Sequence, residues 1–224
     1  MAQVLFMGSE PADFVPYGRT GFDTTTSSPY RRGTLTVTGG SDTFDSDHLS
    51  AGLEEPATEV YATIRVTADT SGAMASRPFL LFRNGSSPVA GLGINGGKLA
   101  LIGFSGATAS TLATSPQAAS YVADAKIDLR LDLTTGKVML WTNGVLMLET
   151  TVSPASFGAP STDSLSLLST GTGTTRFAEI VVARFDLRAA RVATLSPNAN
   201  DPARSGWSGS YTDVADANWQ AADT

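Results

Sequence analysis

A strict two-residue alternation is the feature that most constrains the fold of this chain. In "KIDLRLDLT" (126–134), Ile127, Leu129 and Leu131 alternate with charged residues. This pattern is typical of a β-strand with one dry face and one wet face. The same period predicts further strands at 59–67, 77–85, 89–96, 97–104, 136–144, 145–152, 163–170 and 177–186.

Tight-turn signals separate these strands. Asn95-Gly96-Gly97, Thr134-Thr135-Gly136 and Asn143-Gly144 place residues that tolerate positive φ between apolar runs. They predict a hairpin over 88–103 and a three-stranded meander over 126–151. No segment has a convincing amphipathic helical period. The sequence therefore predicts an all-β fold in which two antiparallel sheets share an apolar interior.

Composition excludes several classes of function. The 224-residue chain is 16% charged, has a net charge of −6 and contains no cysteine. Disulfides and thiolate metal sites are excluded. The isolated pair Arg31-Arg32 is too small a basic patch for nucleic acid. No run approaches a membrane span, and the N-terminus lacks the features of a signal peptide. We expect a protein of bacterial or viral source that is made in the cytoplasm, with neither nucleic-acid binding nor membrane insertion.

The sequences of the strands and turns resemble those of a known fold family. The blocks "VAGLGINGGKLALIG" and "KIDLRLDLTTGKVMLWTNGVLMLET" resemble laminin-G-like, concanavalin A-like jelly rolls. More specifically, "AEIVVARFDLRAARVATLSPN" and "WSGSYTDV" resemble tailed-bacteriophage virion proteins, with Asp186-Leu187-Arg188 where their pattern has "DTR". The resemblance implies a jelly-roll sandwich over 1–196, whose first 33 residues hold an N-terminal strand and loops, and a C-terminal docking arm over 197–224.

The same resemblance implies a structural function in the virion. The implied place is the tail, baseplate or fibre, where the protein contributes to host-surface attachment. A capsid decoration or head-fibre protein is the further alternative. The implied partners are other virion proteins and copies of the same chain, as a trimer or ring-bound copies.

Catalysis has little support in the residues. His48 is the single histidine, and no G-x-S-x-G elbow presents a serine. Asp128 and Asp132 share a strand face but flank Arg130, so we interpret them as a solvated ladder of charges rather than a glycosidase pair. We predict that the protein is not an enzyme and needs no cofactor, except for one candidate metal.

That candidate is calcium. Asp42, Asp45 and Asp47 fall within six residues, and carboxylate oxygens on a loop suit this ion. The loop lacks the glycine and the distal glutamate of an EF-hand. An acidic strand edge that discourages edge-to-edge pairing is the favoured alternative.

Carbohydrate binding is the sharpest small-ligand hypothesis, and it is the alternative to the structural function. If Leu140 lies in the core, Trp141 lies on the outer side and offers a stacking platform for a host glycan, with Asn143 beside it. The competing interpretation is that Trp141 packs beneath a loop or a neighbouring subunit.

The two termini carry the predicted protein interfaces. The N-terminal segment "AQVLFMG" is apolar and is expected to add an edge strand to its own sheet or to that of another chain. The C-terminal arm contains aromatic residues within an otherwise polar segment, which indicates that it docks on a neighbouring chain or on its own sandwich. The candidate interface residues are Val4, Leu5, Phe6, Trp207, Tyr211 and Trp219.

Overall fold

Strands dominate the regular structure of the computed structural model, which describes residues 3–8, 13–17, 35–38, 48–68, 77–118, 125–169 and 174–188. Within these ranges there is no α-helix, and one 3₁₀ turn spans Pro154–Ser156. The strands are Val4–Gly8 (β1), Val15–Tyr17 (β2), Leu35–Thr38 (β3), His48–Ala57 (β4), Glu59–Ala68 (β5), Pro78–Asn84 (β6), Ser87–Asn95 (β7), Lys98–Ser105 (β8), Thr108–Ala118 (β9), Ala125–Asp132 (β10), Lys137–Thr142 (β11), Val145–Thr151 (β12), Thr162–Leu168 (β13) and Thr174–Ala183 (β14).

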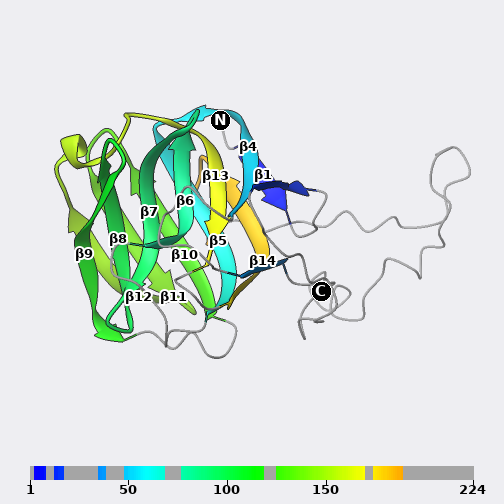
Figure 1. The fold of residues 1–224 in the computed structure, drawn as a ribbon. Helices are drawn as coiled ribbons and strands as arrows, with labels where there is room; N and C mark the ends of the chain where they lie inside the picture. Colours follow the sequence, from blue (N-terminus) through cyan, green and yellow to red (C-terminus); the bar gives the residue numbers. More distant parts are fainter. Residues whose placement is uncertain are drawn as a thin grey trace, which may run out of the picture. The chain divides into compact units, whose positions relative to one another are not determined.

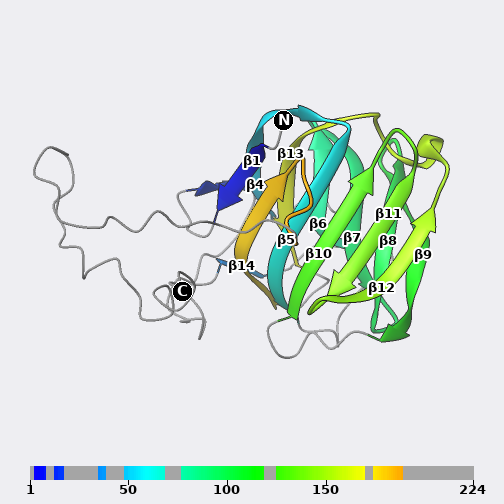
Figure 2. The same cartoon turned by 180° about the vertical axis from the view of Figure 1, so that it is seen from behind.

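Two antiparallel sheets contain these strands. Sheet A has the order β1-β14-β5-β10-β11-β12, with β3 also paired to β14. Sheet B has the order β2-β4-β13-β6-β7-β8-β9. Figure 1 shows the two sheets as layers, and Figure 2, from behind, shows the strands of sheet A side by side. The predicted all-β jelly-roll sandwich of two antiparallel sheets is confirmed.

The predicted hairpins form where the turn chemistry places them. Asn95 and Lys98 pair across a two-residue turn in which Gly96 and Gly97 have φ of 58° and 75°. Asn143 and Gly144, with φ of 50° and 81°, join β11 to β12 in the same way. Two positive φ values in a two-residue loop match the right-handed twist of the flanking strands. The hairpin over 88–103 and the meander over 126–151 are therefore confirmed.

The main core lies between the sheets. Alternate residues of β5 and β10 point inward, and Ile64, Ile127 and Leu131 are at most 1% exposed. Phe177 of sheet A faces Phe79 of sheet B with ring centroids 6.4 Å apart. The inward rows of both sheets thus meet in one hydrophobic interior.

A second apolar cluster lies on the other side of sheet B. Leu81, Ile102, Phe104 and Leu168 are at most 1% exposed and pack apart from the main core. Leu81 pairs with Gly91, which pairs with Ile102, so these side chains share the outward side of adjacent strands. Sheet B is therefore apolar on both faces in this region.

The N-terminal segment adds an edge strand to its own sheet. β1 pairs antiparallel with β14, from Val4 opposite Ala183 to Gly8 opposite Ile180. Leu5 enters the core at 1% exposure, and Phe6 meets Phe14 edge to face at 5.4 Å between ring centroids. Of the two hosts expected for this strand, the chain's own sheet A is the one observed.

The chain divides into two units, Met1–Arg188 and Ala189–Thr224. All described residues belong to the first, so the predicted boundary at 196/197 and the C-terminal arm lie outside them. Among the described segments, no helix has the length and apolar character needed to cross a membrane.

Candidate functional site

The outer face of sheet A carries a row of polar and aromatic side chains. Strand pairing places Thr63 of β5 opposite Asp128 of β10, and Asp128 opposite Trp141 of β11. The next row places Tyr61 opposite Arg130. Since residues that pair directly share a face of the sheet, these side chains lie together on the outward side.

Trp141 lies on this outward side, as its alternation with Leu140 predicts. Leu140 is fully buried in the core, and Trp141 is 5% exposed. The ring is covered by the guanidinium of Arg188, whose Cζ lies 3.4 Å from the ring centroid. This distance is that of a close cation–π stack. The indole is therefore not an open platform in this conformation.

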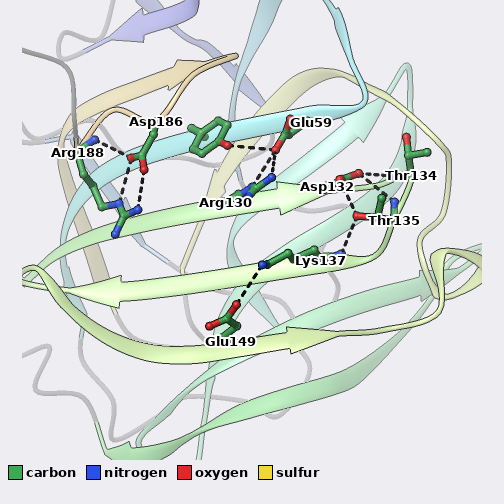
Figure 3. Close-up of polar contacts among 10 residues, drawn as sticks. Glu59, Arg130, Asp132, Thr134, Thr135, Lys137, Glu149, Asp186 and Arg188 are labelled. Carbon is green, nitrogen blue, oxygen red and sulfur yellow. Dashed lines mark hydrogen bonds and ion pairs between the residues drawn. The ribbon is translucent and has the colours of Figure 1, made fainter.

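Asp186 holds the Arg188 guanidinium in place. Arg188 Nε donates to Asp186 Oδ1 at 3.0 Å and Nη2 donates to Oδ2 at 2.6 Å. The backbone N–H of Arg188 also donates to Oδ1, at 3.0 Å. Figure 3 shows the two side chains meeting end to end. The side-chain hydrogen bonds from Arg188 hold the pKa of Asp186 below its usual value, so the carboxylate stays ionised at neutral pH. We call these two residues the Arg188 cap.

A second arginine–carboxylate pair borders the cap. Arg130 Nε donates to Glu59 Oε1 at 2.8 Å, and the Tyr61 hydroxyl donates to the same oxygen at 3.2 Å. The Arg130 guanidinium lies 5.5 Å from the Tyr61 ring centroid. Burial and the Glu59 carboxylate raise the pKa of Tyr61, which therefore keeps its proton at neutral pH. Figure 3 places Arg130 and Glu59 on the same face as the Arg188 cap.

The structure corrects the interpretation of Asp128 and Asp132 as a solvated ladder around Arg130. Asp128 is only 4% exposed and accepts a hydrogen bond from Thr63 at 2.6 Å. Asp132 instead closes the following turn by accepting from the backbone N–H groups of Thr134 and Thr135. These bonds outweigh the effect of burial and lower the pKa of Asp132. Arg130 pairs with Glu59, on the neighbouring strand, and the alternation within one strand did not indicate that partner.

Asn143 is exposed and serves the turn beside Trp141. Its side-chain carbonyl accepts a hydrogen bond from the backbone N–H of Lys126 at 3.0 Å. The backbone N–H of Asn143 donates to the Lys126 carbonyl at 2.8 Å. These hydrogen bonds hold the turn in place, and the predicted glycan contact of Asn143 stays a prediction.

The other candidate residues are dispersed. His48 is 6% exposed and lies in β4, in sheet B, so it does not join the row on sheet A. Asp42, Asp45 and Asp47 lie outside the described residues, as do Trp207, Tyr211 and Trp219. Where residues are described, no group of three histidine, cysteine or acidic side chains is placed to hold a metal ion.

The sequence did not indicate Arg188 or Tyr61 as site residues. Arg188 follows the last strand, and its only signal was the match of Asp186-Leu187-Arg188 to the "DTR" of the phage pattern. An acid and an arginine two residues apart on a turn can form a bidentate pair, which is what the structure shows.

Comparison with known proteins shows likeness in fold alone. No protein-family model matches the chain, and no curated protein matches it. Among solved structures, a sialidase matches with a TM-score of 0.50 at 10% identity, over 81% of this chain and 18% of that chain. A point mutant of HCR/D matches with a TM-score of 0.51 at 9% identity, over 75% of this chain and 42% of that one. The carbohydrate-binding module CBM66 from Bacillus subtilis has a TM-score of 0.43 at 13% identity, over 66% of this chain and 92% of the module.

The first two matches show that this chain shares its fold with parts of those two proteins. This chain spans less than half of either protein. At 9–10% identity, no residue role is transferred from them.

Proposed function

We propose that this chain is a non-catalytic carbohydrate-binding module that recognises a polysaccharide of the host surface through the outer face of sheet A. The observation that carries the proposal is the grouping on that face of two aromatic rings, Tyr61 and Trp141, with the Arg130–Glu59 pair beside Tyr61 and the Arg188–Asp186 pair at Trp141. Sugars are recognised by aromatic rings that pack on their C–H faces, together with planar polar groups that bind their hydroxyls.

The polar groups are suited to hydroxyls because they are preorganised and only partly used. The Arg130 side chain is 29% exposed and points one edge of its guanidinium at the Glu59 carboxylate. A guanidinium has five N–H donors, so several remain on Arg130. The Glu59 carboxylate offers free lone pairs next to these donors. Alternating donors and acceptors of this kind match vicinal diols.

The experiment is a glycan array followed by calorimetric titration of the best polysaccharide. We expect Tyr61→Ala to weaken binding about tenfold or more, since loss of a ring contact removes on the order of 1–2 kcal/mol. Val145→Ala is the matched control, because Val145 is 62% exposed on β12, away from the row of Tyr61 and Arg130. If Tyr61→Ala binds the polysaccharide with wild-type affinity, the outer face of sheet A is not the binding site.

We retain, as a second candidate, a structural function in a tailed-phage virion, in the tail, baseplate or fibre or as a head decoration. One observation favours assembly through the N-terminal side. Three apolar side chains there are exposed, Val4 at 40%, Met7 at 73% and Val15 at 69%, on the terminal strands of the two sheets. Exposed apolar side chains on sheet edges are typical of surfaces that pair with another chain.

Light scattering tests the second candidate. Assembly through this side predicts a trimer or larger ring that Met7→Asp converts to a folded monomer. If the wild-type chain is a monomer and also fails to bind other virion proteins, the structural function is ruled out. The glycan-binding function and the assembly function are compatible, since an attachment protein needs both.

A further inference from the structure

The Arg188 cap occupies the place where a sugar would stack. Trp141 has Asp128 on one side and Leu146 on the other, as its pairing partners on β10 and β12. These neighbours flank the ring at its edges. Its outward π face is taken by the guanidinium, 3.4 Å from the ring centroid. The guanidinium that covers the ring comes from beyond β14, the last of the described strands.

The cap is held by few contacts. In the part of the chain that is described, the polar partner of the Arg188 side chain is Asp186, two residues earlier on the same turn. β14 ends at Ala183, so both residues of the cap lie beyond the sheet ladder. The Asp186–Arg188 pair can therefore leave the indole as a unit without breaking its own hydrogen bonds.

The charges around the ring favour one class of ligand. Asp128 and Asp186 lie beside the indole, and Glu59 lies in the next pair along the face. Each carboxylate is matched by one cation, Lys126, Arg188 and Arg130 in turn. The face has no surplus positive charge for an acidic sugar, and the whole chain has a net charge of −6. A neutral sugar is the ligand that this balance admits.

We propose that Arg188 is an occluding, specificity-determining residue: a neutral pyranose displaces its guanidinium and stacks on Trp141 in its place. This inference rests on the proposed carbohydrate-binding function. A guanidinium and the C–H face of a pyranose both seek the negative π face of an indole, so they compete for it. Wild-type affinity then includes the cost of lifting the cap.

The experiment uses the full chain with Trp207→Phe and Trp219→Phe, which leaves Trp141 as the only tryptophan. Acrylamide quenching measures access to the indole, and titration with dextran, mannan and galactan measures binding. We expect Arg188→Ala to raise the quenching constant at least twofold. It should bind the preferred polysaccharide about tenfold more tightly, as expected when a cation–π contact of ~1.4 kcal/mol no longer competes.

Arg184→Ala is the matched control. Arg184 lies on the same segment but pairs with Glu55 at 3.3 Å and donates to the Pro56 carbonyl, away from the indole. It should leave quenching and affinity unchanged. Trp141→Ala, made in the Arg188→Ala background, should abolish the gain in affinity, and circular dichroism should show both variants folded.

The outcomes separate the inference from the function on which it rests. Weaker binding by Arg188→Ala would overturn the inference and leave the function standing, because Arg188 would then contact the sugar directly. Unchanged quenching with unchanged affinity would overturn it as well, since the cap would not control access to the ring. If quenching rises and none of the three polysaccharides binds any variant, the cap is real but its displacement by a sugar is overturned together with the carbohydrate-binding function.

Discussion

The two outer faces of the sandwich are built on opposite principles. On sheet B, Leu81, Ile102 and Phe104 form a buried apolar cluster outside the main core. On sheet A, the corresponding positions hold partly exposed ion pairs such as Arg130–Glu59. Both faces come from antiparallel strands, and they differ in the side chains that they carry and in how far those side chains are buried.

The buried apolar cluster and the exposed ion pairs contribute differently to the free energy of unfolding. Burying a phenylalanine or leucine contributes about 1.5–3 kcal/mol relative to leaving it exposed. An exposed ion pair contributes about 0–1 kcal/mol. The outer face of sheet B therefore stabilises the fold. The exposed ion pairs on the outer face of sheet A contribute little to stability.

The largest expected effect is on sheet B. Phe104→Ala should lower the free energy of unfolding by about 3–5 kcal/mol, because it removes a fully buried ring and leaves a cavity. Met139→Ala, on the partly exposed face of sheet A, is the matched control and should cost about 1 kcal/mol or less. Urea denaturation measures both. Equal losses would erase the distinction between the faces.

The second-largest expected loss of stability is at Gly93 of β7, because the backbone of Arg77 lies close to it. A Cβ at Gly93 would lie 2.4 Å from the Arg77 carbonyl oxygen and 2.7 Å from Ile102 Cδ1. Gly93→Ala should therefore cost about 1–3 kcal/mol, the usual range for overpacking. Gly52→Ala meets nothing within 4 Å and should be neutral or slightly stabilising. A neutral Gly93→Ala in thermal melts would show that the 77–78 segment does not lie against β7.

On sheet A the expected losses are small. Arg130→Ala should change the free energy of unfolding by about 0.2–1 kcal/mol, since its pair with Glu59 is solvent-screened. The same variant should lose affinity for the polysaccharide if the face binds hydroxyls. Denaturation and titration of one protein sample measure the two effects. A loss of stability above about 2 kcal/mol would place Arg130 with the stabilising residues instead.

The smallest effect is the response of the Arg188 cap to acid. The pKa of Asp186 is depressed in the folded chain, so its pairing energy is present above the unfolded value of about 3.9 and is lost as pH falls through the folded pKa. Acrylamide quenching of Trp141 should therefore stay constant from pH 7 to about 5 and rise below pH 4. Asp186→Asn should show raised quenching at every pH. A flat profile in the chain that carries Trp207→Phe and Trp219→Phe and keeps Asp186, with circular dichroism unchanged, would mean that the carboxylate does not hold the cap.

Sequence periodicity predicted the meander of β10, β11 and β12 well because each strand has one dry face. It missed the short strands β2 and β3, and it also missed the longer strands β4 and β9. β4 carries Glu54, Glu55 and Pro56, and β9 is rich in threonine, serine and alanine. Such strands form because a neighbouring strand offers hydrogen bonds, and their own residues carry little apolar signal.

The candidate site shows the same limit. Alternation with Leu140 predicted which side of sheet A Trp141 occupies. It could not predict Arg188, which reaches Trp141 across 47 positions of sequence and is placed there by the pairing of β14 with β5. The burial of Asp128 was mistaken for solvation for the same reason, since Thr63 lies on a strand whose partner the pattern does not specify.

The pairing of β1 with β14 has a consequence for how the protein is made. The first described strand needs the last one as its partner. The two strands are separated by 165 residues, which take roughly 8–33 s to synthesise at about 5–20 residues per second. The β6–β9 hairpins can close as they emerge, because their contacts are local. β1 must wait, with its apolar residues unpaired, until β14 has left the ribosome. β1 is therefore the strand that stays open to aggregation for longest, and sheet A can be completed only after β14 has emerged.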